Sequence, residues 1–265
     1  MRVLLLGDTH GNTGWVRELA LPIANSVSAD AIFQLGDFGY WDTGGEFVNT
    51  VSRSSIPFYF IDGNHENHPR LPVERGKVVN LTGNLHYVPR GSVLNWDGVK
   101  VLAVGGAHSI DRAYRTPGID WFPEEDISEE DVRFAVSSLT CDVMLAHDAP
   151  STAKLPLVTP YDAVWRAELP SCEANRERVS VIVDAVQPSL YVHGHYHSKW
   201  DFAVKRPWGE YRIVGLDCDG ADISDNMTIL ECVDGAWDLT SLGIKDYLDC
   251  YSNSFSGWFD KTQRN

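Results

Sequence analysis

The sequence contains no apolar run long enough to cross a membrane, and the run near its start, Val3–Leu6, is too short for a secretory signal peptide. Basic residues are also scarce, because 22 lysines and arginines stand against 37 aspartates and glutamates, a net charge of −15. Extended nucleic-acid binding needs a basic surface that displaces phosphate counterions. This charge therefore disfavours long nucleic acids and anionic membranes as partners, and we expect a cytoplasmic protein.

Cysteine is sparse and forms no motif. The five cysteines are scattered, odd in number and without a Cys-x-x-Cys pair, which argues against a disulfide framework and a structural zinc module. Reduced thiols in the cytosol are the simplest explanation. Internal repeats and low-complexity linkers are also missing, so we expect residues 1–265 to form a single domain.

Apolar runs alternate with helical patterns in the first 60 residues. Val3–Leu6, Ala31–Leu35 and Phe58–Ile61 are continuous apolar runs that predict buried strands. The segments between them, Trp15–Ala24 and Glu46–Val51, have helical spacing. This order is typical of βαβ units around a parallel sheet, so the predicted fold class is α/β.

The pattern continues to the end of the chain. Further strands are predicted at Leu85–Val88, Val93–Trp96, Val99–Val104, Val143–Ala146 and Leu190–Val192, and near 201–205, 210–216 and 226–232. Helices are predicted from Ser128 to about Leu139 and from Ser171 to Val186. Two aperiodic segments, near 106–127 and 148–170, are predicted long loops, which usually carry function. The aromatic segment from about 236 is expected to pack on the domain rather than form a dimer contact.

Five predicted strands are followed at once by polar residues that can bind metals. In chain order these are Asp8 and His10, then Asp37, then Asn64 and His65, then His147, then His193, His195 and His197. Ligands gather at the carboxyl ends of strands in α/β sheets. One sheet could therefore bring all five groups to a single edge.

Two of the motifs are rare. Composition predicts about 0.03 occurrences each of Gly-His-x-His, found at Gly194–His197, and of Gly-Asn-His, found at Gly63–His65. A histidine-bearing surface turn is the alternative explanation for the first motif. Two such motifs beside further carboxylates and His147 make coincidence untenable.

These residues resemble a known family. The series Asp8-x-His10, Gly36-Asp37, Gly63-Asn64-His65-Glu66, His147 and Gly194-His195-x-His197 is similar in order and approximate spacing to the calcineurin-like metallophosphoesterase superfamily. The resemblance implies two facing β-sheets flanked by helices, a four-layer αββα sandwich. It also implies two metal ions, one held by Asp8, His10, Asp37 and His197 and the other by Asp37, Asn64, His147 and His195.

Oxygen and imidazole ligands without thiolate suit Mn, Fe, Co, Ni or Zn and do not choose among them. Two ions about 3.5–4 Å apart can lower the pKa of a bridging water and neutralise charge on a phosphoryl group, so the resulting hydroxide would attack phosphorus in line. His65 is assigned no metal, and the resemblance implies that it protonates or stabilises the leaving oxygen. The alternative is that His65 orients Asn64.

The chain departs from the protein phosphatases of this superfamily, which extend the second motif to Gly-Asp-x-x-Asp-Arg-Gly. Here Phe38–Trp41 follow Asp37, so the Asp that orients the catalytic histidine is missing. This disfavours a protein phosphatase. The candidates to orient His65 are Asp42, Glu66 and Asp111.

Three further residues receive weaker assignments. His193 alternates with His195, but the eight ligand places are filled, so we expect it to support the ligands by a hydrogen bond. His108 and Arg112 in the long loop are candidate substrate contacts, because arginine binds phosphate oxygens through a bidentate fork. The alternative is an exposed loop with a solvated arginine.

The leading hypothesis is a metal-dependent phosphoesterase that hydrolyses small phosphodiesters, cyclic or linear nucleotides among them. One alternative is a phosphomonoesterase, including a protein phosphatase. The other is a non-catalytic metallophosphoesterase scaffold that binds a protein partner. A degenerate scaffold should lose ligands or the leaving-group histidine, and all are present here, which favours the enzyme. The sequence does not predict the oligomeric state.

Overall fold

The computed structural model describes residues 1–41, 45–138, 140–157, 160–243, 245–246 and 248. Two predictions fall partly outside this range. They concern Asp42 as a partner of His65, and most of the aromatic C-terminal segment, namely Tyr247, Tyr251, Phe255, Trp258 and Phe259. Among the described residues, no helix combines the length and the apolar character needed to span a membrane.

The first sheet has seven strands in the order β13-β12-β1-β2-β3-β5-β4. Its strands are β1 (Arg2–Leu6), β2 (Ala31–Gln34), β3 (Phe58–Phe60), β4 (Val79–Thr82), β5 (Leu85–Tyr87), β12 (Met227–Val233) and β13 (Ala236–Ser241). The pairs β1–β2, β2–β3 and β3–β5 are parallel. The first two pairs, each joined through a helical segment, are the βαβ units that the alternating apolar runs predict.

The second sheet has six strands in the order β10-β11-β9-β8-β7-β6. Its strands are β6 (Ser92–Trp96), β7 (Val99–Val104), β8 (Val143–Ala146), β9 (Leu190–His193), β10 (Trp200–Arg206) and β11 (Gly209–Gly215). The β6–β7 hairpin turns at Asp97 and Gly98, which both have positive φ. Two such residues give the turn whose twist matches a hairpin.

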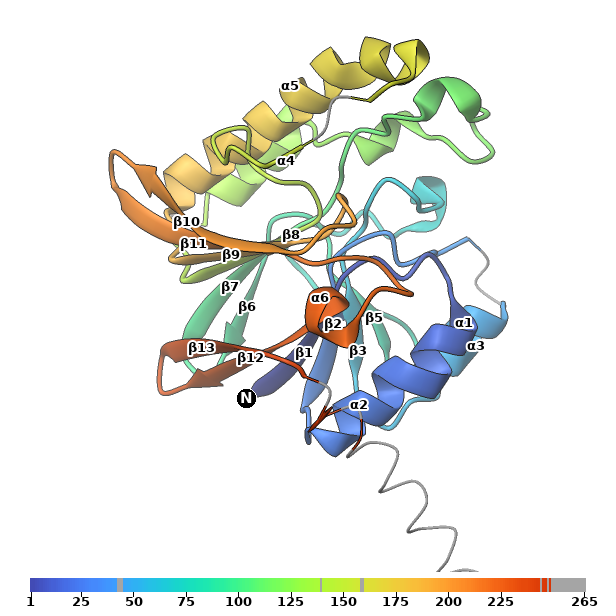
Figure 1. Ribbon diagram of the computed structural model, residues 1–265, viewed down its shortest axis with the longest axis vertical. Coiled ribbons are helices and arrows are strands. Elements are labelled where there is room, and N and C mark those ends of the chain that lie inside the picture. Colours follow the sequence, from blue (N-terminus) through green and yellow to red (C-terminus); the bar gives the residue numbers. More distant parts are fainter. Residues whose placement is uncertain (42–44, 139, 158–159, 244, 247, 249–265) are drawn as a thin grey trace, which may run out of the picture.

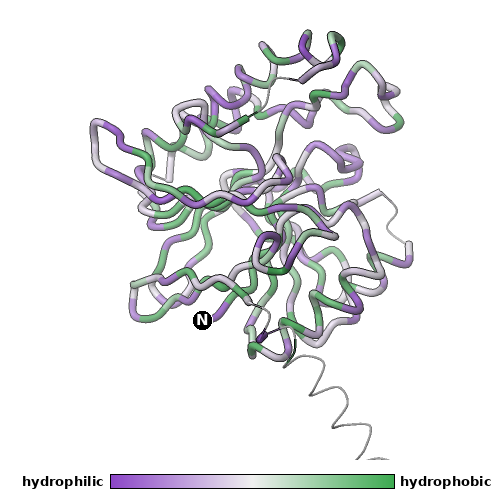
Figure 2. The backbone as a smooth tube through the Cα atoms, in the orientation of Figure 1, coloured by the Kyte–Doolittle hydropathy of each residue, from purple (hydrophilic) through white to green (hydrophobic). Residues whose placement is uncertain are grey.

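The two sheets pack face to face over a common core. Val3 and Leu5 of β1 lie in this core with Val143 and Leu145 of β8, all fully buried. The alternate residues Leu4 and Leu6 point to the opposite face and pack under the helices. Figure 2 shows the hydrophobic segments following the strands through the interior.

Helices cover both outer faces (Figure 1). On the first sheet lie α3 (Glu46–Ser52) and one continuous helix built from α1 (Thr13–Trp15), the π-helical η1 (Val16–Ala20) and α2 (Leu21–Ser26). On the second sheet lie α4 (Glu129–Val136) and α5 (Ala163–Val186). The predicted αββα sandwich is confirmed. The short helices are η2 (His68–Arg70), η3 (Arg112–Tyr114), η4 (Pro123–Glu125) and α6 (Ile223–Asn226).

Helix α5 begins eight residues before its predicted start at Ser171, so the predicted loop 148–170 is too long. The side chain of Asp162 caps the helix by accepting a hydrogen bond from the Val164 N–H. Residues 163–169 are largely exposed and have no apolar periodicity, and Pro170 lies inside the helix. The helix ends at Val186 before Pro188, as predicted.

Candidate metal centre

The polar groups at the strand ends come from both sheets. Asp8 follows β1 and Asp37 follows β2 in the first sheet, whereas His147 follows β8 in the second. The expectation that one sheet gathers all five groups is therefore wrong. The sandwich aligns the carboxyl ends of both sheets instead, and His147 Nδ1 lies 2.8 Å from the carbonyl oxygen of Leu35 across the interface.

Asp8, His10 and His197 form the first cluster, with one potential ligand atom of each lying within 4.8 Å of the others. His197 Nε2 is 3.0 Å from Asp8 Oδ2. His10 and His197 both have positive φ, at 45° and 46°. Such backbone is uncommon for residues other than glycine and tends to occur at functional sites.

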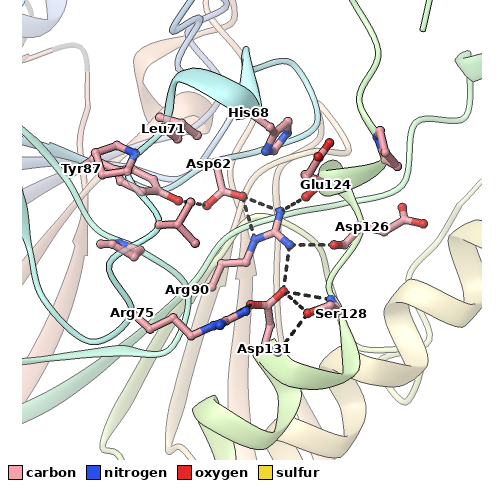
Figure 3. Close-up of a pocket in the computed structure, with 14 residues that line it drawn as sticks. Asp62, His68, Leu71, Arg75, Tyr87, Arg90, Glu124, Asp126, Ser128 and Asp131 are labelled. Carbon is pink, nitrogen blue, oxygen red and sulfur yellow. Dashed lines mark hydrogen bonds and ion pairs between the residues drawn. The ribbon is translucent and has the colours of Figure 1, made fainter. Parts of the chain in front are cut away.

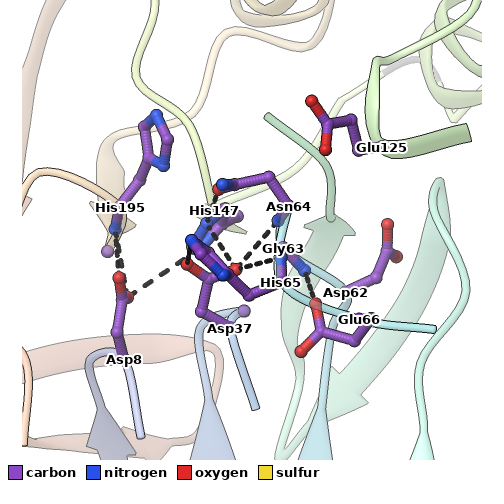
Figure 4. Close-up of polar contacts among 12 residues, drawn as sticks. Asp8, Asp37, Asp62, Gly63, Asn64, His65, Glu66, Glu125, His147 and His195 are labelled. Carbon is purple, nitrogen blue, oxygen red and sulfur yellow. Dashed lines mark hydrogen bonds and ion pairs between the residues drawn. The ribbon is translucent and has the colours of Figure 1, made fainter. Parts of the chain in front are cut away.

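Asp37, His147 and His195 form the second cluster by the same measure. His147 Nε2 lies 3.4 Å from Asp37 Oδ1 and 3.2 Å from Asn64 Oδ1. The Nδ1–H of His147 donates to Leu35, which leaves Nε2 directed at the cluster, where a metal ion would replace its proton. Asn64 Nδ2 donates to Ser109 Oγ at 3.0 Å, so its Oδ1 faces the cluster (Figure 4).

Asp37 lies between the two clusters. Its Oδ1 is the oxygen near His147, and its Oδ2 is 3.8 Å from His10 Nε2 and 4.0 Å from His65 Nε2. Backbone N–H groups of Asn64 and His65 fix Oδ1, each at 2.8 Å. One carboxylate thus presents a different oxygen to each cluster.

The electrostatics of the clusters favour a bound cation. Burial disfavours a charged His147, yet the Asp37 carboxylate raises the pKa of His147 to about 10. Burial and the neighbouring His147 lower the pKa of His195 to about 3, so its ring is neutral and keeps a lone pair. Two buried carboxylates attract positive charge, which without a metal is a proton on His147, and they lie beside the neutral ring of His195. A transition-metal ion would take the place of that proton, so the clusters fit two such ions.

Two motif glycines allow the chain to approach the carboxylates. A Cβ atom at Gly63 would collide with Asp37 Oδ1, and one at Gly194 would collide with Asp8 Oδ1. The next residue, His195, donates its backbone N–H to Asp8 Oδ1 at 3.0 Å. The glycine in each rare motif is therefore required by the close packing of backbone and carboxylate.

Asp219 supports the first cluster and was not predicted. Its Oδ1 lies 3.0 Å from His10 Nδ1, and its Oδ2 accepts from Asn12 Nδ2 at 2.6 Å. A carboxylate on the far nitrogen of a ligating histidine fixes the ring and its tautomer. Asp219 lies in the turn after β11, where no sequence motif distinguishes it from neighbouring acidic residues.

His65 lies outside both clusters and contacts an arginine. Its Nε2 meets Arg115 Nη2, while Arg115 Nη1 donates to the Asn64 carbonyl oxygen at 3.0 Å. Asp111 forms a 2.8 Å ion pair with Arg115. The carboxylate of Glu66 instead accepts from the backbone N–H groups of Gly39 and Gly63. In the described part of the chain, Arg115 rather than Glu66 or Asp111 therefore makes the direct contact with His65.

His108 and Arg112, the two predicted substrate residues, point elsewhere. His108 is buried between Asp126 and Glu168, with ring nitrogens 2.8 and 3.0 Å from their carboxylates. The guanidinium carbon of Arg112 lies 4.5 Å from the ring centroid of Trp121. Within the part of the chain that the structure describes, neither side chain contacts a predicted metal ligand.

His193 is fully buried and both ring nitrogens are occupied. Its Nε2 accepts from Trp200 Nε1 at 3.0 Å, and its Nδ1 lies 2.9 Å from the Gly194 carbonyl oxygen. Burial lowers the pKa of His193 to about 3, so the ring is neutral. This arrangement fits the supporting role predicted for it.

The family model for calcineurin-like phosphoesterases matches residues 1–199 of the chain. Among solved structures, a hypothetical protein from Thermus thermophilus is similar, with 13% identity, a TM-score of 0.49, and coverage of 91% of this chain and 98% of that one. A novel archaeal phosphodiesterase is also similar (11% identity, TM-score 0.43, coverage 91% and 100%). So is a novel phosphatase from Mycoplasma pneumoniae (11% identity, TM-score 0.48, coverage 91% and 93%). No curated protein matches the chain. Because the matched region spans most of the sequence and contains all the predicted metal ligands, the chain belongs to the calcineurin-like phosphoesterase family.

Proposed function

We propose that this phosphoesterase hydrolyses small phosphodiesters, cyclic or linear nucleotides among them, with two ions drawn from Mn, Fe, Co, Ni and Zn. The observation that carries the proposal is the position of Asp37, with one carboxylate oxygen turned to each cluster and His65 beside them. Asp8, His10, Asp37 and His197 would hold one ion, and Asp37, Asn64, His147 and His195 the other. When bound, two such ions supply an activated water and neutralise charge on the phosphoryl group.

The remaining chemistry falls to His65 and Arg115. The imidazole of His65 would protonate the leaving oxygen, and its position supports this role, because its Nε2 lies 4.0 Å from Asp37 Oδ2 and belongs to neither cluster. Arg115 is held by Asp111 and by the Asn64 carbonyl oxygen, so its guanidinium is fixed beside His65. From there it can donate to a phosphoryl oxygen of the substrate.

Two features support a diester over a monoester. Tyr40 and Trp41 stand where the phosphatase motif has its Asp and Arg, and the buried Tyr40 ring packs beside Phe60 with centroids 5.9 Å apart. In the described part of the chain, Arg115 is the arginine that contacts the predicted catalytic residue. A singly charged diester needs fewer cationic partners than a doubly charged monoester.

The test is hydrolysis of bis-p-nitrophenyl phosphate against p-nitrophenyl phosphate after reconstitution with each of the five metals. We expect faster turnover of the diester, and a loss of activity in Asn64→Ala and His65→Ala of about 100-fold or more. His86→Ala, a histidine in the first sheet away from the clusters, is the matched control. Failure to hydrolyse either ester with any of these metals would overturn the enzymatic proposal. Preference for the monoester would overturn only the assignment to diesters.

A further inference from the structure

A pocket outside the candidate metal centre lies next to the loop that carries Asn64 and His65. Its volume is about 380 Å³, within the usual range for sites of small molecules. Asp62 lines it just before the loop, and His68 and Leu71 line it just after. Figure 3 shows the His68 imidazole between Leu71 and Glu124, above the Asp62–Arg90 pair. The pocket is thus bounded by both ends of the loop without containing a predicted metal ligand.

The hydrogen-bond donors of this pocket are already used. Arg90 donates Nε–H to Asp62, Nη1–H to the Asp126 carbonyl and to Asp131, and Nη2–H to the carbonyls of Glu124 and Glu125. The Tyr87 hydroxyl donates to Asp62 Oδ1 at 2.8 Å. Arg75, the other guanidinium in the lining, pairs with Asp131 at 3.0 Å and with Glu130 at 2.9 Å. Few donors are left for an anionic ligand such as a phosphate or carboxylate.

Acceptors, in contrast, are available. His68 Nε2 is buried and has no hydrogen-bond partner among the described residues, and His68 is 9% exposed. Burial lowers the pKa of His68 to about 4, so the ring is neutral and one nitrogen can accept. Among the residues that the structure describes, the Glu124 carboxylate has no ion pair, and Asp126 uses only Oδ1, for His108.

The lining also carries a net negative charge. Four carboxylates line the pocket, those of Asp62, Glu124, Asp126 and Asp131, against the two guanidiniums of Arg75 and Arg90. Five of the other lining residues are apolar, namely Leu71, Pro72, Val73, Pro89 and Pro123. A ligand that fits would combine a donor-rich cation with a short hydrocarbon.

We propose that this pocket binds a small organic cation of the alkylguanidinium or alkylamine class. The cationic head donates to Glu124, Asp126 and His68 Nε2, and the hydrocarbon packs against Leu71 and the prolines. The site is separate from the proposed substrate site, and its chemistry is opposite, because phosphate esters are anionic. Occupancy would satisfy the orphaned His68 nitrogen, which otherwise costs free energy when buried.

Calorimetric titration of the metal-loaded protein tests this proposal. The probes are n-butylguanidinium, the neutral hexanamide and the anionic hexanoate, which have similar size and differ in charge. We expect n-butylguanidinium to bind in about the millimolar range and at least about tenfold more tightly than either control probe. Equal or weaker binding of the cation would overturn the proposal, as would a crystal structure with the cation bound elsewhere.

Two variants locate the site. Glu124→Gln removes one charge from an exposed residue of the lining, and we expect binding to weaken about threefold to tenfold. Glu129→Gln makes the same charge change nearby, but Glu129 pairs with Arg178 and neither residue lines the pocket, so this variant should leave binding within about twofold. His68→Phe removes the orphaned acceptor and keeps a ring, and should weaken binding as well. Equal effects of Glu124→Gln and Glu129→Gln would overturn the assignment to this pocket.

Discussion

Arg115 places its guanidinium against Nε2 of His65, the nitrogen that also lies 4.0 Å from Asp37. Arginine only donates hydrogen bonds, so this contact requires an unprotonated Nε2. Burial and the Arg115 charge lower the pKa of His65, and Asp37 opposes them by raising it. Arg115 therefore sets how readily His65 takes up a proton.

Replacing Arg115 with Gln should change the pH profile of the enzyme. Without the guanidinium the pKa of His65 rises, so the protonated ring persists to higher pH. If His65 is the general acid, the alkaline limb of kcat shifts upward, while kcat/KM falls about tenfold because a donor to the substrate is lost. Arg112→Gln, on the same loop but stacked on Trp121, is the control and should leave the limb in place. An unmoved limb in Arg115→Gln would contradict this role.

Asp219→Asn should weaken the first metal site. The carboxylate holds His10 Nδ1 at 3.0 Å, and losing such a partner typically lowers metal affinity about 10-fold to 100-fold. Competition with a chelator, followed for each metal equivalent, measures the effect. Only the ion at Asp8, His10 and His197 should be released more easily. Asp222→Asn, an exposed acidic residue nearby, provides the comparison, and equal affinities in the two variants would count against this role for Asp219.

The strand ends were predictable because the strands that precede the candidate ligands, such as β2, β8 and β9, are buried on both faces. A run such as Val143–Ala146 is continuously apolar and ends at a polar residue, so the sequence marks the place where the sheet presents a ligand. The edge strand β4 gives no such signal, since its residues alternate between half-buried and exposed. The first turns of α5 are exposed and therefore lack the apolar spacing that indicates a helix.

The candidate metal ligands could be predicted because they directly follow buried strands. The residues that hold them or His65 in position could not. Arg115 and Asp219 lie in aperiodic segments, and their contacts with His65 and His10 depend on how distant loops are folded. Arg112 and Arg115 lie three residues apart on one loop, and no sequence pattern tells which of them contacts His65. The short helix η3 turns Arg112 toward Trp121 and leaves Arg115 beside His65.

Glu125→Gln should alter how the stability of the metal-free protein depends on pH. Both oxygens of Glu125 accept from Ser109, from its N–H and its hydroxyl, each at 2.7 Å. Burial nevertheless raises the pKa of Glu125 to about 7, against 4.5 for the unperturbed group. Between these values the folded protein binds more protons than the unfolded chain, so the free energy of unfolding falls as pH rises.

The Glu125→Gln variant has no ionisable group at this position, so its stability should not fall in this way as pH rises. Relative to Glu125→Gln, the wild-type protein should lose up to about 3 kcal/mol of stability between pH 4.5 and pH 7. Urea unfolding at a series of pH values measures the difference. Glu129→Gln, on the exposed side of α4, is the control, and its stability should depend on pH as that of the wild type does. A constant difference between wild type and Glu125→Gln would show that Glu125 does not titrate in this window.

Trp200→Phe tests the support given to the histidine stretch. Trp200 Nε1 is the donor to His193 Nε2, and His193 is fully buried with a neutral ring, so no water replaces the lost bond. An unsatisfied buried acceptor costs about 1–3 kcal/mol, and the variant should lose about that much stability in urea. Trp208→Phe is the control, because the Trp208 indole N–H donates a hydrogen bond of the same length, 3.0 Å, to Asp184. The Asp184 carboxylate keeps its ion pair with Arg206, so this variant should lose less than about 1 kcal/mol of stability. If both variants lose the same stability, the effect comes from ring packing and not from the bond to His193.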